Sequence, residues 1–228
     1  GKVQGLDLEE AAKLAVDTNK YYANELGINS AARVTTVKPS GTTSCVLGTS
    51  SGVHAWHNDY YIRRIRVGKN EAIYTYLQVN HPELVEDDFF KPETQAVISI
   101  PQKAEEGGIL RHETSIELLD RVKDIYQRWI ANGHVAGNNT HNVSCTVSVK
   151  EDEWDLVGRW MWNNKEFYNG LSVLPYFAAD STYTQLPFED IDETQFTELV
   201  STLKEVDVSQ VVELIDNTDL TGELACAG

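Results

Sequence analysis

The chain has 228 residues, of which 41% are hydrophobic and 24% charged, and a globular protein of this size can bury a sizeable core. No apolar run approaches the ~20 residues of a membrane span, and a net charge of −16 argues against binding to nucleic acid or anionic membranes. Cys45, Cys145 and Cys226 are an odd set without metal-ligand spacing, so neither a disulfide scaffold nor a metal site is expected. Since the N-terminus shows no secretory signal, we expect a cytoplasmic protein.

Hydrophobic periodicity predicts alternating helices and strands along the chain. One helix should begin behind the Asp7-x-x-Glu10 pattern and end at Gly27, and another should begin at the Thr114-x-x-Glu117 pattern. The expected helices cover residues 8–26, 71–79, 114–129, 151–163 and 194–205. The expected strands cover residues 33–37, 62–67, 95–100 (ended by Pro101), 142–149 and 171–174.

Strands separated by helices of ten or more residues favour a largely parallel α/β sheet or barrel, in which ligands bind at the carboxyl ends of strands. The loop after Val37 occupies such an end. Beyond residue 185 the composition shifts to 11 acidic residues and one lysine, which predicts a separate acidic helical segment over 186–228. The tryptophans at helical positions are expected in the core; they are Trp129, Trp154, Trp160 and Trp162.

The loop that follows the first expected strand has the composition of an anion site. It reads Lys38-Pro-Ser-Gly-Thr-Thr-Ser, with a glycine for close backbone approach and several hydroxyls. A helix beginning near Thr43 would add free N–H groups and a dipole that stabilise an anion by ~0.3 to 2 kcal/mol. Because Lys38 precedes the glycine, the segment is not an ordinary nucleoside triphosphatase phosphate loop. The alternative interpretation is a plain strand-to-helix turn, which has the same composition.

Local charge favours the anion interpretation. From Lys38 to Lys69 there are five basic residues against one acid, a local charge of +4 in an acidic chain. The run Arg63, Arg64 and Arg66 supplies most of it, and it could equally be a solvated strand edge or a contact for a nucleotide or a chain tail.

Several motifs resemble the adenosylcobalamin-dependent (class II) ribonucleotide reductases. The first are Val37-Lys-Pro-Ser-Gly-Thr-Thr-Ser, Ser51-Gly-Val-His-Ala-Trp-His and Asp59-Tyr-Tyr-Ile-Arg-Arg-Ile-Arg. Further motifs follow in the family's order: His141-Asn-Val-Ser-Cys-Thr-Val-Ser-Val-Lys-Glu-Asp-Glu-Trp, Gly170-Leu-Ser-Val-Leu-Pro-Tyr and Tyr183-Thr-Gln-Leu-Pro-Phe-Glu. The resemblance covers nearly the whole chain.

The resemblance implies the C-terminal half of a ten-stranded α/β barrel over residues 1–185, with the acidic extension and a truncated tail over 186–228. It implies reduction of ribonucleotides to deoxyribonucleotides by a thiyl radical, which homolysis of adenosylcobalamin starts. The family's Pro-Ser-Gly-Thr loop holds the substrate phosphate, and that role passes to the residues Pro39, Ser40, Gly41, Thr42, Thr43 and Ser44. The diphosphate or triphosphate nature of the substrate stays open.

One family motif is absent. The Asn-Pro-Cys-Gly-Glu type of finger loop, which carries the radical cysteine, occurs nowhere in the sequence, so we expect no catalytic residue and no turnover without an N-terminal half on the same or a separate chain. Cys45 and Cys145 inherit no role and are expected to be packed thiols. Leu224-Ala-Cys-Ala-Gly resembles the start of the family's redox tail, which suggests that Cys226 relays electrons from a thioredoxin-type reductant.

The remaining candidates line the expected cleft. His54 and His57 are three residues apart, but no carboxylate or cysteine joins them at ligand spacing, so we expect cleft contacts rather than a metal site. The resemblance places cofactor-facing backbone at 170–176 and 178–185, where the alternative is a buried strand with its exit loop. The cofactor-facing candidates are Gly170, Leu171, Ser172 and Pro175. A second hypothesis for the whole chain is a non-catalytic module that binds a nucleotide or a partner subunit.

Overall fold

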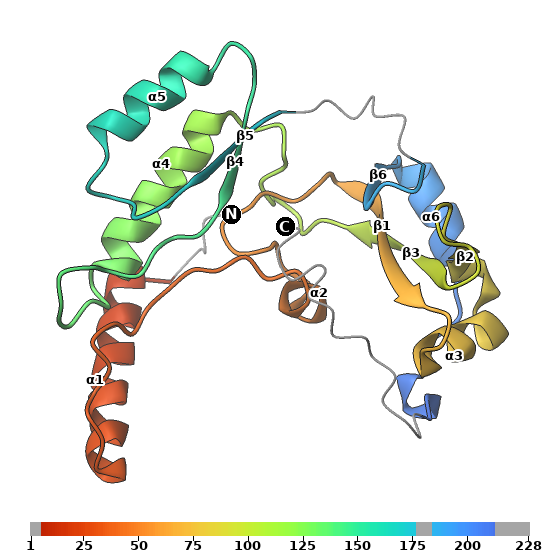
Figure 1. Ribbon diagram of the computed structural model, residues 1–228, viewed down its shortest axis with the longest axis horizontal. Coiled ribbons are helices and arrows are strands. Elements are labelled where there is room, and N and C mark those ends of the chain that lie inside the picture. Colours follow the sequence, from red (N-terminus) through yellow and green to blue (C-terminus); the bar gives the residue numbers. More distant parts are fainter. Residues whose placement is uncertain (1–5, 177–183, 213–228) are drawn as a thin grey trace. The chain divides into compact units, whose positions relative to one another are not determined.

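A computed structural model of the chain describes residues 6–176 and 184–212, in two compact units (Figure 1). Unit 1 comprises the described parts of 1–56 and 107–178, and unit 2 those of 57–106 and 179–225. The boundary expected between residues 185 and 186 stays a prediction. Among the described residues, no helix combines the length and the apolar character that a membrane crossing requires.

Unit 1 is built on parallel strand pairing covered by helices. β4 (Thr146–Val149) pairs in parallel with β5 (Ser172–Pro175), and a parallel bridge joins Val37 to Val143, ahead of β4. α4 (Ser115–Ile125), which continues as the π-helix η2 (Tyr126–Ile130), packs on α5 (Trp154–Asn163) and on β4. Their core is almost entirely aliphatic, and its fully buried members include Leu119, Val122, Val143, Val147, Val149 and Val157.

The first and fourth helices of the chain begin at the caps that the sequence predicts. The Asp7 carboxylate accepts the Glu9 and Glu10 N–H groups at the start of α1 (Leu8–Leu26), and Gly27 ends the helix at φ 67°. Thr114 and Glu117 form a reciprocal capping box at the start of α4. α1 packs on η2 through a face that includes Ala12, Val16 and Ala23.

Unit 2 is an antiparallel sheet, in the order β2-β3-β1-β6, and α6 packs on it (Figure 1). Its elements are β1 (Tyr60–Gly68), α3 (Ala72–Asn80), the 3-10 turn η1 (Pro82–Leu84), β2 (Val85–Asp87), β3 (Gln95–Lys103), β6 (Phe188–Asp190), α6 (Glu193–Thr202) and the 3-10 turn η3 (Val208–Gln210). The largely parallel arrangement expected for the whole chain is therefore wrong for unit 2, because the turn after β2 returns the chain as β3, which lies between β2 and β1 and pairs antiparallel with both.

Three expectations about single elements are also wrong. Residues 33–37 make two isolated bridges, from Arg33 to His134 and from Val37 to Val143, rather than a continuous strand. β3 runs on through Pro101, which is tolerated because β2 pairs only with residues 96–98 and leaves β3 unpaired on that side there. Trp154 and Trp162 are exposed on α5, whereas Trp160 is buried in the core.

Candidate functional site

The candidate phosphate loop, Pro39–Ser44, leaves the parallel bridge at Val37 and leads into α2 (Thr43–Leu47). The helix begins at the residue that the sequence predicts. The side chain of its N-cap residue, Thr42, makes no capping hydrogen bond. The Ser44 hydroxyl donates a hydrogen bond back to the Ser40 carbonyl and is buried, which closes the loop on itself. Of the hydroxyls in the loop, that of Ser44 is thus used internally, whereas Thr42 and Thr43 are exposed.

A second segment, Ser51–His54, lies against this loop, and we call it the clamp segment. The Ser51 hydroxyl accepts the Ser40 N–H at 2.8 Å. Gly52 has a φ of +60°, and a Cβ there would lie 2.7 Å from the Lys38 carbonyl oxygen. Only glycine therefore allows the two backbones to approach so closely. Sequence reasoning missed both residues, although a glycine inside Ser51-Gly-Val was a signal of close approach.

The far side of the clamp segment is tied to β4 and α4. The His54 ring bridges two backbone groups: its Nε2 accepts the Thr146 N–H at 3.1 Å, and its Nδ1 lies 2.9 Å from the Ser51 carbonyl oxygen. Because an amide N–H can only donate, Nε2 is the acceptor and the proton of the neutral ring lies on Nδ1. Both ring nitrogens of His54 thus bind backbone groups. The expectation that His54 lines a cleft stays a prediction.

Val53, which precedes His54 in the clamp segment, is also fixed in place by unit 1. Its side chain is buried in the core of unit 1, and its carbonyl accepts Arg121 Nε at 3.2 Å. Arg121 in turn makes two hydrogen bonds of 2.6 Å to the Glu113 carboxylate. Arg121, which is held by Glu113, thus fixes the Val53 carbonyl of the clamp segment. This contact could not be predicted from the spacing of the residues in the sequence.

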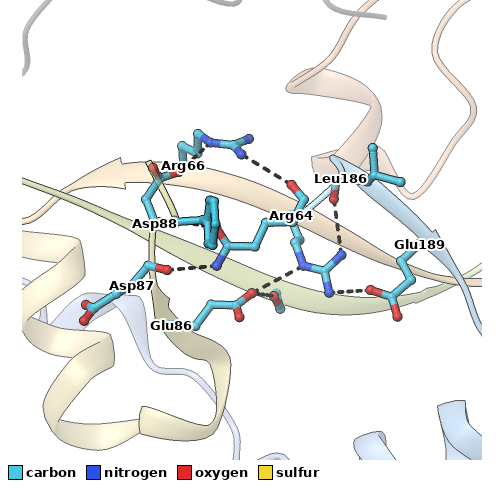
Figure 2. A network of polar contacts seen from close by, with 10 residues as sticks. Arg64, Arg66, Glu86, Asp87, Asp88, Leu186 and Glu189 are labelled. Carbon is cyan, nitrogen blue, oxygen red and sulfur yellow. Dashed lines mark hydrogen bonds and ion pairs between the residues drawn. The ribbon is translucent and has the colours of Figure 1, made fainter. Parts of the chain in front are cut away.

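The local positive charge expected to attract an anion is neutralised by acidic neighbours in unit 2 (Figure 2). Arg64 pairs with Glu86 and Glu189 and also donates to the Leu186 carbonyl, and Arg66 pairs with the buried Asp88 at 2.8 Å. Lys69 pairs with Asp87 at 2.6 Å. These carboxylates come from β2, the residue after it and β6, so counting charge along the sequence overstated the field available to an anion. Of the three arginines, Arg63 lies over the Phe188 ring, at 5.5 Å from its centroid.

Asp88 shows why this network is structural. Burial disfavours its charge, but hydrogen bonds from the Lys91 N–H, Arg66 and the Phe90 N–H outweigh the burial and lower the pKa of the carboxyl. Asp88 thus stabilises the turn after β2 and ties it to β1 through Arg66.

His57 belongs to unit 2, whereas His54 belongs to unit 1. The His57 Nε2 atom lies 3.1 Å from an Asp190 carboxylate oxygen, and its ring stacks on Phe188 at 4.9 Å between centroids. Within residues 6–176 and 184–212, no group of three or more His, Cys, Asp or Glu side chains could hold a metal ion.

The cofactor-facing candidates follow β5. Leu171 packs against the core of unit 1, and Gly170 accepts the Asn142 amide at 2.7 Å through its carbonyl. Ser172, Leu174 and Pro175 are exposed; because side chains alternate along a strand, Ser172 and Leu174 lie on one face of β5 and Pro175 on the other. The rest of the expected cofactor segment, 178–183, lies outside the described residues.

The cysteines differ from one another. Cys145 is buried, as expected, and burial raises the pKa of its thiol to about 11. Cys45 is exposed, so the expectation that it is packed is wrong, because only Ser44 of the five residues in α2 is buried. Cys226 lies outside the described residues.

Comparison with known proteins shows to which enzymes the chain is related. Its homologues are adenosylcobalamin-dependent ribonucleoside-triphosphate reductases. One relative, described as a probable enzyme of this kind in Dictyostelium discoideum, is 31% identical over 87% of this chain and 25% of its own length. The reductase of Lactobacillus delbrueckii subsp. bulgaricus is 28% identical over 94% of this chain and 29% of its own length. The chain thus spans little more than a quarter of these relatives.

A solved structure shares the fold. The crystal structure of a B12-dependent, class II ribonucleotide reductase matches with a TM-score of 0.69 and 24% identity, over 85% of this chain and 26% of that one. No family model matches the chain. The resemblance expected from the motifs is confirmed.

Proposed function

We propose that this chain is the part of an adenosylcobalamin-dependent ribonucleotide reductase that holds the phosphate of the substrate. The residues that would hold it are those of the loop Pro39–Ser44, through the backbone N–H groups that follow Ser40 and the hydroxyls of Thr42 and Thr43. The observation that carries the proposal is the loop's architecture: it follows a parallel strand pairing, leads directly into a helix, and is fixed from behind by Ser51 and Gly52. A plain turn would not need that support.

The substrate is proposed to be a ribonucleoside triphosphate, as in the names of the relatives. With the arginines of β1 engaged by carboxylates or an aromatic ring, the nearest full charge in sequence is that of Lys38, which is exposed. Recognition would therefore rest on the hydroxyls and backbone amides of the loop, with Lys38 as the adjacent positive charge.

The exposed side chains of β5 would contact the cofactor. Ser172 and Leu174 share one face of the strand, and at Gly170, two residues before it, an added Cβ would meet nothing within 4 Å. A large, flat macrocycle such as a corrin could approach the backbone there, and Pro175 would add apolar surface at the end of the strand. When bound, adenosylcobalamin supplies the radical that starts the reduction; the residues of this chain would only position it and shield it from water.

The remainder of the enzyme is proposed to come from an N-terminal half, which would complete a ten-stranded barrel with residues 1–185 and supply the radical cysteine that this sequence lacks. Residues 186–228 would form the acidic extension. Electrons would arrive from a thioredoxin-type reductant through Cys226.

The test combines the chain with a polypeptide that carries the upstream segment of a relative, together with adenosylcobalamin, a dithiol and a ribonucleoside triphosphate. We expect deoxynucleotide formation from the mixture and none from the chain alone. Gly41→Val should abolish substrate binding with a modest loss of stability, because a branched side chain would obstruct the anion. Gly158→Val is the matched control, since Gly158 is exposed on α5 with open space around its Cα. Unchanged nucleotide affinity in Gly41→Val would refute the assignment of the loop.

A further inference from the structure

A series of hydrogen bonds connects the proposed phosphate loop to the core of unit 1. It begins at the Ser40 N–H, which donates to the Ser51 hydroxyl at 2.8 Å. It continues from the Ser51 carbonyl to His54 Nδ1 at 2.9 Å and from His54 Nε2 to the Thr146 N–H at 3.1 Å. Thr146 is the first residue of β4, of which Val147 and Val149 are buried in the core.

We propose that Ser51 and His54 are positioning residues that hold the phosphate loop in its binding geometry, an inference that rests on the proposed function. A loop of Gly, Ser and Thr has many accessible conformations, and ordering it on ligand binding would cost conformational entropy. Ser51 removes part of that cost beforehand, because its hydroxyl fixes Ser40, the residue next to Gly41.

The Ser51 hydroxyl has a defined role in this arrangement. By accepting from Ser40, it engages that amide with the clamp segment, so an anion would be bound by the other donors of the loop. The turn that presents Ser51 is itself closed by the His54 N–H, which donates to the Ser51 carbonyl at 3.1 Å. Both backbone and ring of His54 therefore converge on one carbonyl.

His54 transmits the rigidity of β4 to that turn. The Thr146 N–H directs the ring to accept at Nε2, which leaves the Nδ1 proton for Ser51. Gly52 supports the same arrangement from the other side, because its contact with the Lys38 and Pro39 backbone leaves no room for the loop to move inward. The ring hydrogen bonds of His54 go to Ser51 and Thr146, so His54 acts on the loop through Ser51.

The experiment uses the 228-residue chain, with inorganic tripolyphosphate as the probe in calorimetry and with the Ser40 amide followed by NMR hydrogen exchange. Ser51→Ala should accelerate exchange at Ser40 and weaken tripolyphosphate binding by about fivefold, the scale of one hydrogen bond. Ser51→Thr keeps the hydroxyl and should restore both. Ser50→Ala is the matched control, because the Ser50 hydroxyl has no hydrogen bond within the described residues. His54→Phe should change both readouts in the direction of Ser51→Ala.

Unchanged Ser40 exchange and affinity in Ser51→Ala would overturn the proposal, as would an imidazole ¹⁵N spectrum of His54 showing the proton on Nε2. If the wild-type chain binds no tripolyphosphate while Ser40 exchange still responds to Ser51→Ala and recovers in Ser51→Thr, the proposed phosphate function fails and the hold of the clamp segment on the loop is upheld. The two failures are thus distinguishable.

Discussion

Substitution of Gly52 by alanine tests the crossing of the clamp segment over the proposed phosphate loop. Gly52 has a φ of +60°, and left-handed backbone costs an L-residue about 1 to 2 kcal/mol. Its Cβ would also lie 2.7 Å from the Lys38 carbonyl oxygen, 3.1 Å from the carbonyl carbon and 3.3 Å from the Pro39 Cα. Since all three atoms are backbone, the strain cannot be relieved by a rotamer change and should add about 1 to 3 kcal/mol, the usual cost of overpacking.

Gly48 provides the control for the cost of placing alanine in left-handed backbone. It has a φ of +62°, and a Cβ there meets nothing within 4 Å, so Gly48→Ala should cost only the first 1 to 2 kcal/mol or so. The free energy of unfolding of both variants would be measured by urea titration of tryptophan fluorescence. Equal losses would show that the close approach at Gly52 carries no strain and would refute the reasoning.

Two further predictions concern charge and reactivity. Because the pKa of Asp88 is lowered from its ordinary 3.8 in the folded chain, its ionisation contributes stability that is present above about pH 4 and is lost as the pH falls through the folded-state value. Asp88→Asn should therefore lower the urea midpoint at pH 7 and flatten its fall towards pH 3; an unchanged acid limb would contradict this. In a Cys226→Ser background at pH 8, a disulfide reagent should modify Cys45 quickly and Cys145 only after unfolding, since burial raises the pKa of the Cys145 thiol to about 11. Equal rates in the native chain would refute the burial of Cys145.

The elements that the sequence predicts well are those in which local chemistry and tertiary packing agree. The capping box at Thr114 and the left-handed Gly27 each involve residues close together in the sequence. The helix ends that they define can therefore be predicted from the local sequence. The pairing of β1 with β3 cannot be predicted in this way, because it depends on a strand inserted between two others. The α3 connection leads to β2, which runs in the same direction as β1, and the turn after β2 then returns the chain as β3 between them.

The site shows the same contrast. The loop at Pro39–Ser44 and the start of its helix were predictable from turn residues and their order. The neutralisation of Arg64 and Arg66 was not, since their carboxylate partners lie 22 or more residues away and are brought close only by strand pairing. The exposure of Cys45 was missed because helical periodicity says little about a helix of five residues.

The crossing of Gly52 over Lys38 also determines how the loop could be transplanted. A Pro-Ser-Gly-Thr-Thr-Ser hexapeptide grafted onto another strand–helix junction would carry the hydroxyls but leave behind Ser51 and the ring of His54. The smallest portable unit is the stretch 38–54 together with a neighbouring strand that offers an N–H where Thr146 does. For enzyme design, the recipient scaffold must therefore be chosen by its adjacent strand rather than by the junction alone.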